Sequence, residues 1–275
     1  MQPCRRKFIF TSAACAGNFL LDYGGVAADN IKKCNEVVGL ARCNNSNGIS
    51  CLGELLFGIE SDDGADKPLQ IRVPKRLRKI VAQSGYTGFD DALKADVLDR
   101  LNGLFGINPK FSYFDESFTD ESPGAFASSS PRAEILFGVQ LLGRMLERPG
   151  GDYAALAICA HEYGHLLQDK MSIKEKIANQ LPCYAIELHA DLLAGYFVGV
   201  FKDRYPSADL QRIGSVWELW RPFSCTHGSQ EHRLAAIQSG YELSQVNPGA
   251  TVEQVSELGI NQCRSTKKLN DMNRL

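Results

Sequence analysis

The central part of the chain carries residue types whose spacing suits metal-dependent hydrolysis. His161, Glu162 and His165 form the pattern H-E-x-x-H. On a helix, residues four apart lie on one face, so both imidazoles can reach a single ion while Glu162 points around the turn toward a water. Neutral imidazole suits Zn²⁺, and a carboxylate can accept the proton that the metal makes labile. The pattern therefore predicts a zinc site that uses Glu162 as its general base.

A third protein ligand is needed, because catalytic zinc takes three ligands from the protein and keeps one position open. Glu187 and Asp191 lie four residues apart in a second apolar stretch. We expect Glu187 to bind the metal and Asp191 to accept the free ring N–H of His161 or His165. His189 is a rival ligand, but it lies two residues from Glu187 and points to another face. A place on the helix surface or a hydrogen bond in the core is the better interpretation of His189.

His227 and Arg233 stand near a turn that leads into a predicted helix. Either side chain can donate a hydrogen bond to the oxyanion of a tetrahedral intermediate, which enzymes with this pattern need beside the metal. The alternative is structural, with His227 capping the helix and Arg233 pairing with Glu231 or Asp191. We expect His227 to take part in catalysis and Arg233 to support the site together with Asp191.

Two helices must position the predicted ligands. Apolar residues recur at helical intervals from about Asp152 to Met171, which predicts one helix that carries both histidines. A second helix is predicted from about residue 172 or 174 to Lys202, and it carries the candidate carboxylates. Both stretches are largely apolar, so we expect these helices to lie in the centre of the fold.

Shorter patterns predict the remaining elements. Phe111 to Phe114 alternates like a strand, and Ile135 to Val139 is a short apolar strand candidate. Residues 75–104 have helical spacing with a break at 84–88, which predicts two helices. Residues 207–244 are predicted to be largely helical. Helices beside a small sheet indicate the α+β class.

The first 28 residues differ in character from the rest of the chain. Basic residues at 5–7 precede a moderately apolar run from Phe8 to Leu21, and the small residues 26–28 follow. This order is typical of an export signal, and its beginning resembles the twin-arginine type. We therefore expect export to the periplasm or the extracellular space. An ordinary secretory signal, an uncleaved anchor and an unstructured start of a cytosolic protein are the alternatives.

The cysteines fit an exported protein. Of the nine cysteines, Cys4 and Cys15 would leave with the signal, and the seven that remain are an odd number, so at least one thiol stays free or pairs between chains. Cys34, Cys43 and Cys51 lie in a loop-like stretch, which suits a loop held by a disulfide in an oxidising compartment.

Charge and composition exclude two classes of partner. The chain has 30 basic and 32 acidic residues and no long Lys/Arg block, so we expect no binding to nucleic acid or to an anionic membrane surface. No apolar run after the N-terminus is long enough to predict a membrane span in the mature chain. A peptide or protein substrate is the expected partner, and the oligomeric state stays open.

Three ordered blocks of sequence resemble one known family. They are residues 160–165, residues 187–195 and residues 227–233. Together they resemble the bacterial neutral zinc metallopeptidases, which are gluzincins distantly similar to the membrane proteases that process prenylated proteins. The resemblance spans about residues 133 to 241. It implies a zincin-like α+β fold with an active-site helix, a second ligand-bearing helix and a small sheet whose edge strand, here Ile135 to Val139, pairs with extended substrate.

The chain departs from the family pattern at two positions. His189 stands where Gln is common, and Leu192 stands where Cys is frequent, but neither touches the proposed ligands. The resulting division of the chain has four parts: an export signal at 1–28, an N-terminal region of uncertain structure at 29–132, a catalytic core at 133–245 and a peripheral segment at 246–275.

The sequence therefore predicts a zinc metallopeptidase. Two alternatives stay open, namely a zinc enzyme that hydrolyses non-peptide amides and an exported metal-binding or chaperone-like protein with a structural zinc. A structural site would be closed by a fourth protein ligand. Cys159 and Cys183 are the candidates for that fourth ligand.

Overall fold

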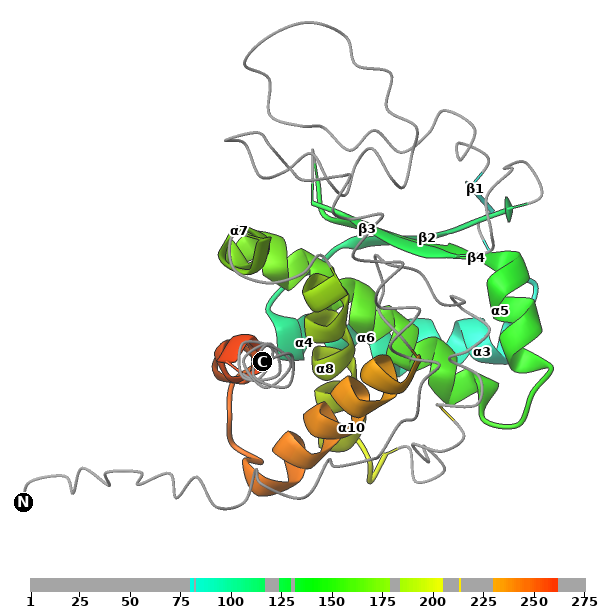
Figure 1. Ribbon diagram of the computed structural model, residues 1–275. Helices are drawn as coiled ribbons and strands as arrows, with labels where there is room; N and C mark the ends of the chain where they lie inside the picture. Colours follow the sequence, from blue (N-terminus) through cyan, green and yellow to red (C-terminus); the bar gives the residue numbers. More distant parts are fainter. Residues whose placement is uncertain are drawn as a thin grey trace, which may run out of the picture. The chain divides into compact units, whose positions relative to one another are not determined.

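The computed structural model of the chain describes residues 80–81, 83–116, 124–129, 132–178, 184–204, 213 and 230–261. These residues form an α+β unit, as predicted, with a small sheet beside a group of helices (Figure 1). The predicted export signal and Cys34, Cys43 and Cys51 lie outside the described residues.

The sheet is mixed and has the strand order β1-β2-β4-β3. Its strands are β1 (Ile80–Val81), β2 (Lys110–Phe114), β3 (Ala125–Ser128) and β4 (Glu134–Gly138). β2 and β4 run parallel, and the outer strands β1 and β3 pair antiparallel with them.

Both predicted strands are present, but the predicted edge strand is wrong. β4 lies inside the sheet between β2 and β3, and it ends at Gly138 because the next helix begins at Val139. β3 is the edge strand on this side of the described sheet. Its four residues Ala-Phe-Ala-Ser are too short and too weakly alternating to predict a strand.

Alternating side chains give the sheet two different faces. Tyr113, Ile135 and Phe137 are buried in the main core together with apolar residues of the helices. Their neighbours Phe114 and Leu136 form a separate small cluster, which has the period of two expected for strands.

The helical run before β2 corrects a second prediction. Residues 80–81 form β1 rather than a helix, because they pair with Tyr113 and Phe114 more than thirty positions along the chain. One continuous run then follows, made of α3 (Thr87–Ala92), the π-helical turn η2 (Leu93–Val97) and α4 (Leu98–Phe105). α4 ends at Gly106, whose φ of 60° places it in the left-handed region that glycine adopts without strain.

The helix α5 (Val139–Leu146) begins directly after β4, and a distant carboxylate caps it. Glu116 is buried, and its oxygens accept the backbone N–H groups of Gln140 at 2.8 Å and Leu141 at 3.0 Å. These N–H groups have no partner within the helix, so Glu116 satisfies donors that burial would otherwise leave unpaired.

The helix α6 (Gly151–Lys170) is the central element, and it matches the predicted helix to within one residue at each end. It is buried around most of its circumference, and it contacts β3, β4, α4, α5 and the following helices. A helix that is apolar on all sides belongs in the core.

The second predicted helix is described as two helices, α7 (Ile173–Ala178) and α8 (Tyr184–Val200), and residues 179–183 lie outside the described part. α8 packs between α6 and α10 (Gln230–Val246). A Cβ on Gly164 would lie 3.2 Å from the Cα of Ala190, so the absence of a side chain lets α6 approach α8 closely. On the other side of α8, a Cβ on Gly240 would lie 1.8 Å from the carbonyl oxygen of Leu192.

A further helix covers residues 252–261, and it corrects the expectation that everything after residue 245 is peripheral. Val252, Val255, Ser256 and Ile260 are buried, because one face of this short helix packs against the rest of the fold. Among the described helices, none combines the length and the apolar character that a bilayer crossing requires.

Candidate metal centre

Two adjacent helices bring the three predicted ligands together. His161 Nε2 lies 3.3 Å from Glu187 Oε2, and His165 Nε2 lies 3.6 Å from Glu187 Oε1. The two imidazole rings are nearly perpendicular, with centroids 4.6 Å apart. The histidines come from α6 and the glutamate from the first turn of α8, and Gly164 permits the close approach of the two helices at Ala190.

This group can hold a metal ion. One ligand atom from each of His161, His165 and Glu187 can be chosen so that all lie within 4.8 Å of one another. Each imidazole Nε2 faces a different oxygen of the Glu187 carboxylate, at 3.3 Å for His161 and 3.6 Å for His165. His161 is 1% exposed at its side chain, whereas His165 is 14% exposed, so solvent reaches the group on the His165 side.

The ring of His161 is held from behind by a carboxylate. Asp191 Oδ1 lies 2.7 Å from His161 Nδ1, and both side chains are buried. A carboxylate only accepts hydrogen bonds, so Nδ1 carries the hydrogen and Nε2 faces Glu187. Of the two histidines that the sequence offered to Asp191, the structure thus pairs it with His161.

Arg233 from α10 completes this buried group. Its Nε lies 2.8 Å from Asp191 Oδ2, and its Nη2 lies 2.8 Å from Asp191 Oδ1, which is a two-pronged ion pair. Of the two partners considered from the sequence, Asp191 rather than Glu231 receives these two bonds. A guanidinium that donates twice to Asp191 is oriented toward it, which favours support of the site over contact with a substrate oxyanion.

The charges of this group reinforce one another. Burial alone would lower the pKa of His161, but the charges and hydrogen bonds of Asp191 and Glu187 raise it to about 9. Burial would raise the pKa of Asp191, but Arg233 and His161 hold it below its ordinary value. In the metal-free protein, the ring of His161 is therefore positively charged at neutral pH and carries a second hydrogen, on Nε2. Metal binding must displace that second hydrogen.

We expect the stability of the metal-free protein to fall at alkaline pH. Because the folded pKa of His161 lies above its ordinary value of 6.5, the stabilising contribution is fully present below about pH 6.5 and is lost as pH rises through about 9. Thermal unfolding of the chelator-treated chain between pH 6 and 10 measures this. His161→Gln should lack this particular loss, and equal pH dependence in the variant and the parent would contradict the assignment.

Glu162, the predicted general base, is buried next to His161 and is 2% exposed. Burial is the main reason why the pKa of Cys159 is raised, and the charge of Glu162 raises it further. Cys159 is a free, buried thiol, and it does not belong to the metal-binding group among the described residues. Cys183 lies outside the described residues.

His165 is held by Gln168, which the sequence pattern did not single out. Gln168 Oε1 lies 2.9 Å from His165 Nδ1, three positions further along α6. Gln168 Nε2 lies 2.7 Å from the carbonyl oxygen of Ile186 and 3.0 Å from His189 Nδ1. The signal was available, because residues three apart on a helix are neighbours. The long-range partners were not predictable from spacing.

His189 is a hydrogen-bonding residue of the core and does not join the ligand group. It is fully buried, and its Nε2 lies 3.0 Å from the carbonyl oxygen of Ser256. Burial, the largest effect, lowers its pKa to about 4, so the ring is neutral at ordinary pH. His227, the other predicted catalytic histidine, lies outside the described residues.

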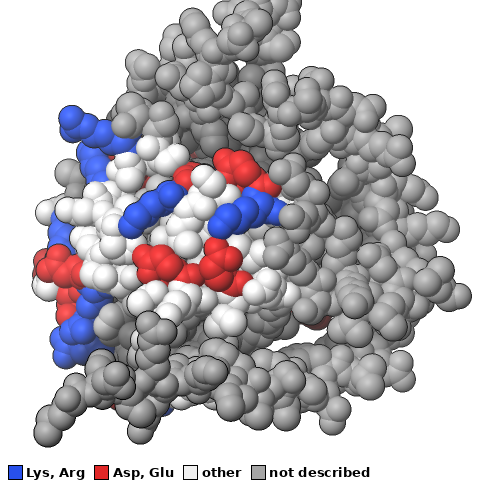
Figure 2. Space-filling model, turned by 90° about the vertical axis from the view of Figure 1, so that its left-hand side faces the viewer, with Lys and Arg blue, Asp and Glu red and all other residues white. Residues whose placement is uncertain are grey.

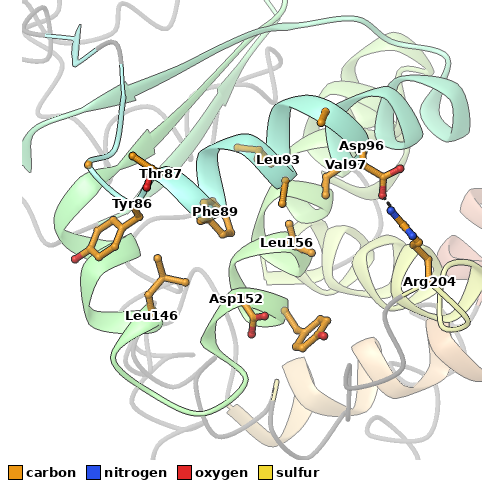
Figure 3. Close-up of a pocket in the computed structure, with 15 residues that line it drawn as sticks. Tyr86, Thr87, Phe89, Leu93, Asp96, Val97, Leu146, Asp152, Leu156 and Arg204 are labelled. Carbon is orange, nitrogen blue, oxygen red and sulfur yellow. Dashed lines mark hydrogen bonds and ion pairs between the residues drawn. The ribbon is translucent and has the colours of Figure 1, made fainter.

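A cavity of about 810 Å³ lies at the other end of α6 (Figure 3). Its walls come from the run of α3 and η2 and from the first turns of α6, including Phe89, Leu93, Asp152 and Leu156. Asp96 and Arg204 form an ion pair at 3.2 Å on its rim. His161, His165 and Glu187 do not line this cavity, so it is separate from the candidate metal centre.

The described surface carries charges of both signs close together. Lys174 pairs with Asp169 at 2.7 Å, and Lys176 pairs with Glu257 at 3.0 Å. On the face drawn in Figure 2, basic and acidic side chains are interspersed, and no large patch of one sign is visible among the described residues.

Comparison of the chain with protein-family models, with curated proteins and with solved structures found no match. The case for a function therefore depends on the arrangement of His161, His165 and Glu187 and on the residues around them.

Proposed function

We propose that the chain is a zinc-dependent metallopeptidase with a zincin-like catalytic unit. The observation that supports this most is the convergence of His161, His165 and Glu187 from two buried helices. Three protein ligands are the number that catalytic zinc sites use. Glu162, which lies between the two histidines in the sequence, gives the group a general base. A site that only binds metal does not need such a base.

The donor set suits zinc, because imidazole nitrogens and carboxylate oxygens are ligands that zinc prefers. Zinc supplies Lewis acidity, which polarises a carbonyl group and makes water acidic enough to lose a proton near neutral pH. Glu162 accepts that proton and returns it to the leaving amine. Asp191 and Gln168 keep the imidazole Nε2 atoms directed toward the ion.

The sheet offers a way to bind an extended peptide. β3 lies at the edge of the described sheet and contacts α6, the helix that carries the histidines. A peptide that adds to such an edge forms backbone hydrogen bonds with little dependence on its side chains. We assign this role to β3 in place of the strand predicted from the sequence.

Zinc removal and return test this function. The zinc-loaded full chain should cleave an unfolded protein such as reduced casein, lose activity when a chelator removes the metal, and regain it when one equivalent of zinc is added. Cleavage of small acyl amides without cleavage of the protein would favour an amide hydrolase. Bound zinc without hydrolysis of either substrate would favour a structural metal and contradict the proposal.

A further inference from the structure

Three buried polar side chains lie behind the metal centre and do not belong to the ligand group of His161, His165 and Glu187. Gln168, His189 and Ser256 are each 0% exposed. Hydrogen bonds connect them in one row from His165 to the helix over residues 252–261. Burying polar groups is costly unless each donor meets an acceptor, so the hydrogen bonds of the row must run in a definite direction.

The backbone carbonyl of Ile186 fixes that direction. It lies 2.7 Å from the Nε2 atom of Gln168, and a carbonyl oxygen can only accept a hydrogen bond. The amide NH₂ of Gln168 must therefore face Ile186, because turning the amide over would place two oxygens against each other. Gln168 Oε1 then faces His165 Nδ1 at 2.9 Å, and since this oxygen only accepts, Nδ1 must carry the hydrogen.

The hydrogen bonds from Gln168 through His189 to Ser256 run in the direction that Ile186 sets. The amide NH₂ of Gln168 also lies 3.0 Å from His189 Nδ1, so this nitrogen accepts and His189 Nε2 carries the hydrogen. His189 Nε2 donates to the carbonyl oxygen of Ser256 at 3.0 Å, with the Ser256 hydroxyl 3.1 Å away. A Cβ on Gly259 would lie only 3.2 Å from His189 Cδ2, so the helix over residues 252–261 packs tightly against the ring.

We propose that Gln168 and His189 are positioning residues that hold His165 as the Nδ1–H tautomer and so leave its Nε2 free for the metal. The inference rests on the metal centre proposed above and extends it to a helix that contributes no ligand. Through Ser256, the helix over residues 252–261 orients His189, and His189 together with the Ile186 carbonyl determines which end of the Gln168 amide faces His165.

The two metal-binding histidines are therefore supported in different ways. Asp191 has only acceptor oxygens, so it selects the tautomer of His161 however it is turned. The amide of Gln168 has a donor end and an acceptor end, and it selects the tautomer of His165 only when Ile186 and His189 orient it. Changes in the row should affect His165 and leave the ring of His161 as it is.

The tautomer of His165 can be observed directly in the full chain without metal. Long-range ¹H–¹⁵N correlation spectra distinguish the two tautomers of a histidine ring. The parent should show His165 with hydrogen on Nδ1, and Gln168→Met should show a mixture of both forms. Hydrogen on Nε2 of His165 in the parent would overturn the proposal, whether or not any variant folds.

Zinc affinity, measured by competition with a chromophoric chelator, gives the second readout. Gln168→Met nearly keeps the side-chain volume but loses the acceptor, and it should raise the Kd for zinc roughly 10–100-fold, as other losses of groups behind metal ligands do. Gln238→Met makes the same chemical change on the exposed face of α10 and should leave the Kd unchanged.

Two substitutions of His189 distinguish a role in hydrogen bonding to Gln168 from a role in packing alone. His189→Asn places an acceptor near the position of Nδ1 and keeps the contact to Gln168. His189→Gln reaches the position of Nε2 and keeps the contact to Ser256, but it loses the contact to Gln168. His189→Asn should therefore retain more of the zinc affinity than His189→Gln, and the reverse order would contradict the proposal.

The outcomes distinguish this inference from the proposed function. A parent that binds zinc, together with a folded Gln168→Met variant of the same affinity and tautomer, would overturn the positioning role and leave the metal centre intact. A parent that binds no zinc would overturn both.

Discussion

Replacing Glu162 with Gln should abolish most hydrolysis while zinc remains bound. Gln has nearly the same shape, but its amide cannot accept the proton from water. Loss of a general base typically lowers the rate about 10²–10⁴-fold, so kcat should fall by that order. Zinc content should stay at the level of the parent, because Glu162 does not belong to the group of His161, His165 and Glu187.

The matched control is Glu175→Gln, which makes the same change at an exposed position of α7. It should leave zinc content and kcat unchanged. Rates of casein hydrolysis and zinc analysis on the same preparations give both quantities. If the Glu162→Gln variant cleaves as fast as the parent, Glu162 is not the general base. If the variant has lost its zinc, Glu162 is a metal ligand.

Breaking the Asp191–Arg233 pair should cause the largest loss of stability. Both side chains are buried, and two hydrogen bonds of 2.8 Å join them. Removing one partner deprives the other of its two-pronged ion pair in the core, which typically costs about 3–5 kcal/mol. We expect a loss of this order for Asp191→Ala and for Arg233→Met in denaturant unfolding of the metal-free chain.

The double variant tests whether the cost comes from the unpaired charge. When both partners are replaced, neither charge of this pair is left in the core without the other, so the double variant should lose much less than the sum of the single variants. The exposed pair Lys176–Glu257 provides the comparison, since Lys176→Met should cost less than about 1 kcal/mol. Additive losses from Asp191 and Arg233 would contradict the account of the pair.

The sequence predicted those features that depend on neighbours within one helix. The spacing of His161 and His165 places them on one face of α6, and the spacing of Glu187 and Asp191 does the same on α8. Helical periodicity placed the ends of α6 to within one residue. The spacing alone did not predict that the two histidines and Glu187 meet. That contact was expected only because catalytic zinc needs a third protein ligand.

Features that depend on distant partners were not predicted. Residues 80–81 have helical spacing, but pairing with β2 makes them a strand, and β3 is too short to give a signal of its own. Ser256 bonds to His189 across 67 positions of sequence, so no local pattern reveals it. Tertiary contacts override local preference at such places.

The central claim is that His161, His165 and Glu187 hold one zinc ion with a position left for water. X-ray absorption spectroscopy of the zinc-loaded full chain tests it most directly. We predict one zinc per chain with only nitrogen and oxygen neighbours at about 2.0–2.1 Å, and loss of that site in Glu187→Ala. A sulfur neighbour at about 2.3 Å would indicate a site closed by cysteine, and it would contradict the proposed catalytic centre.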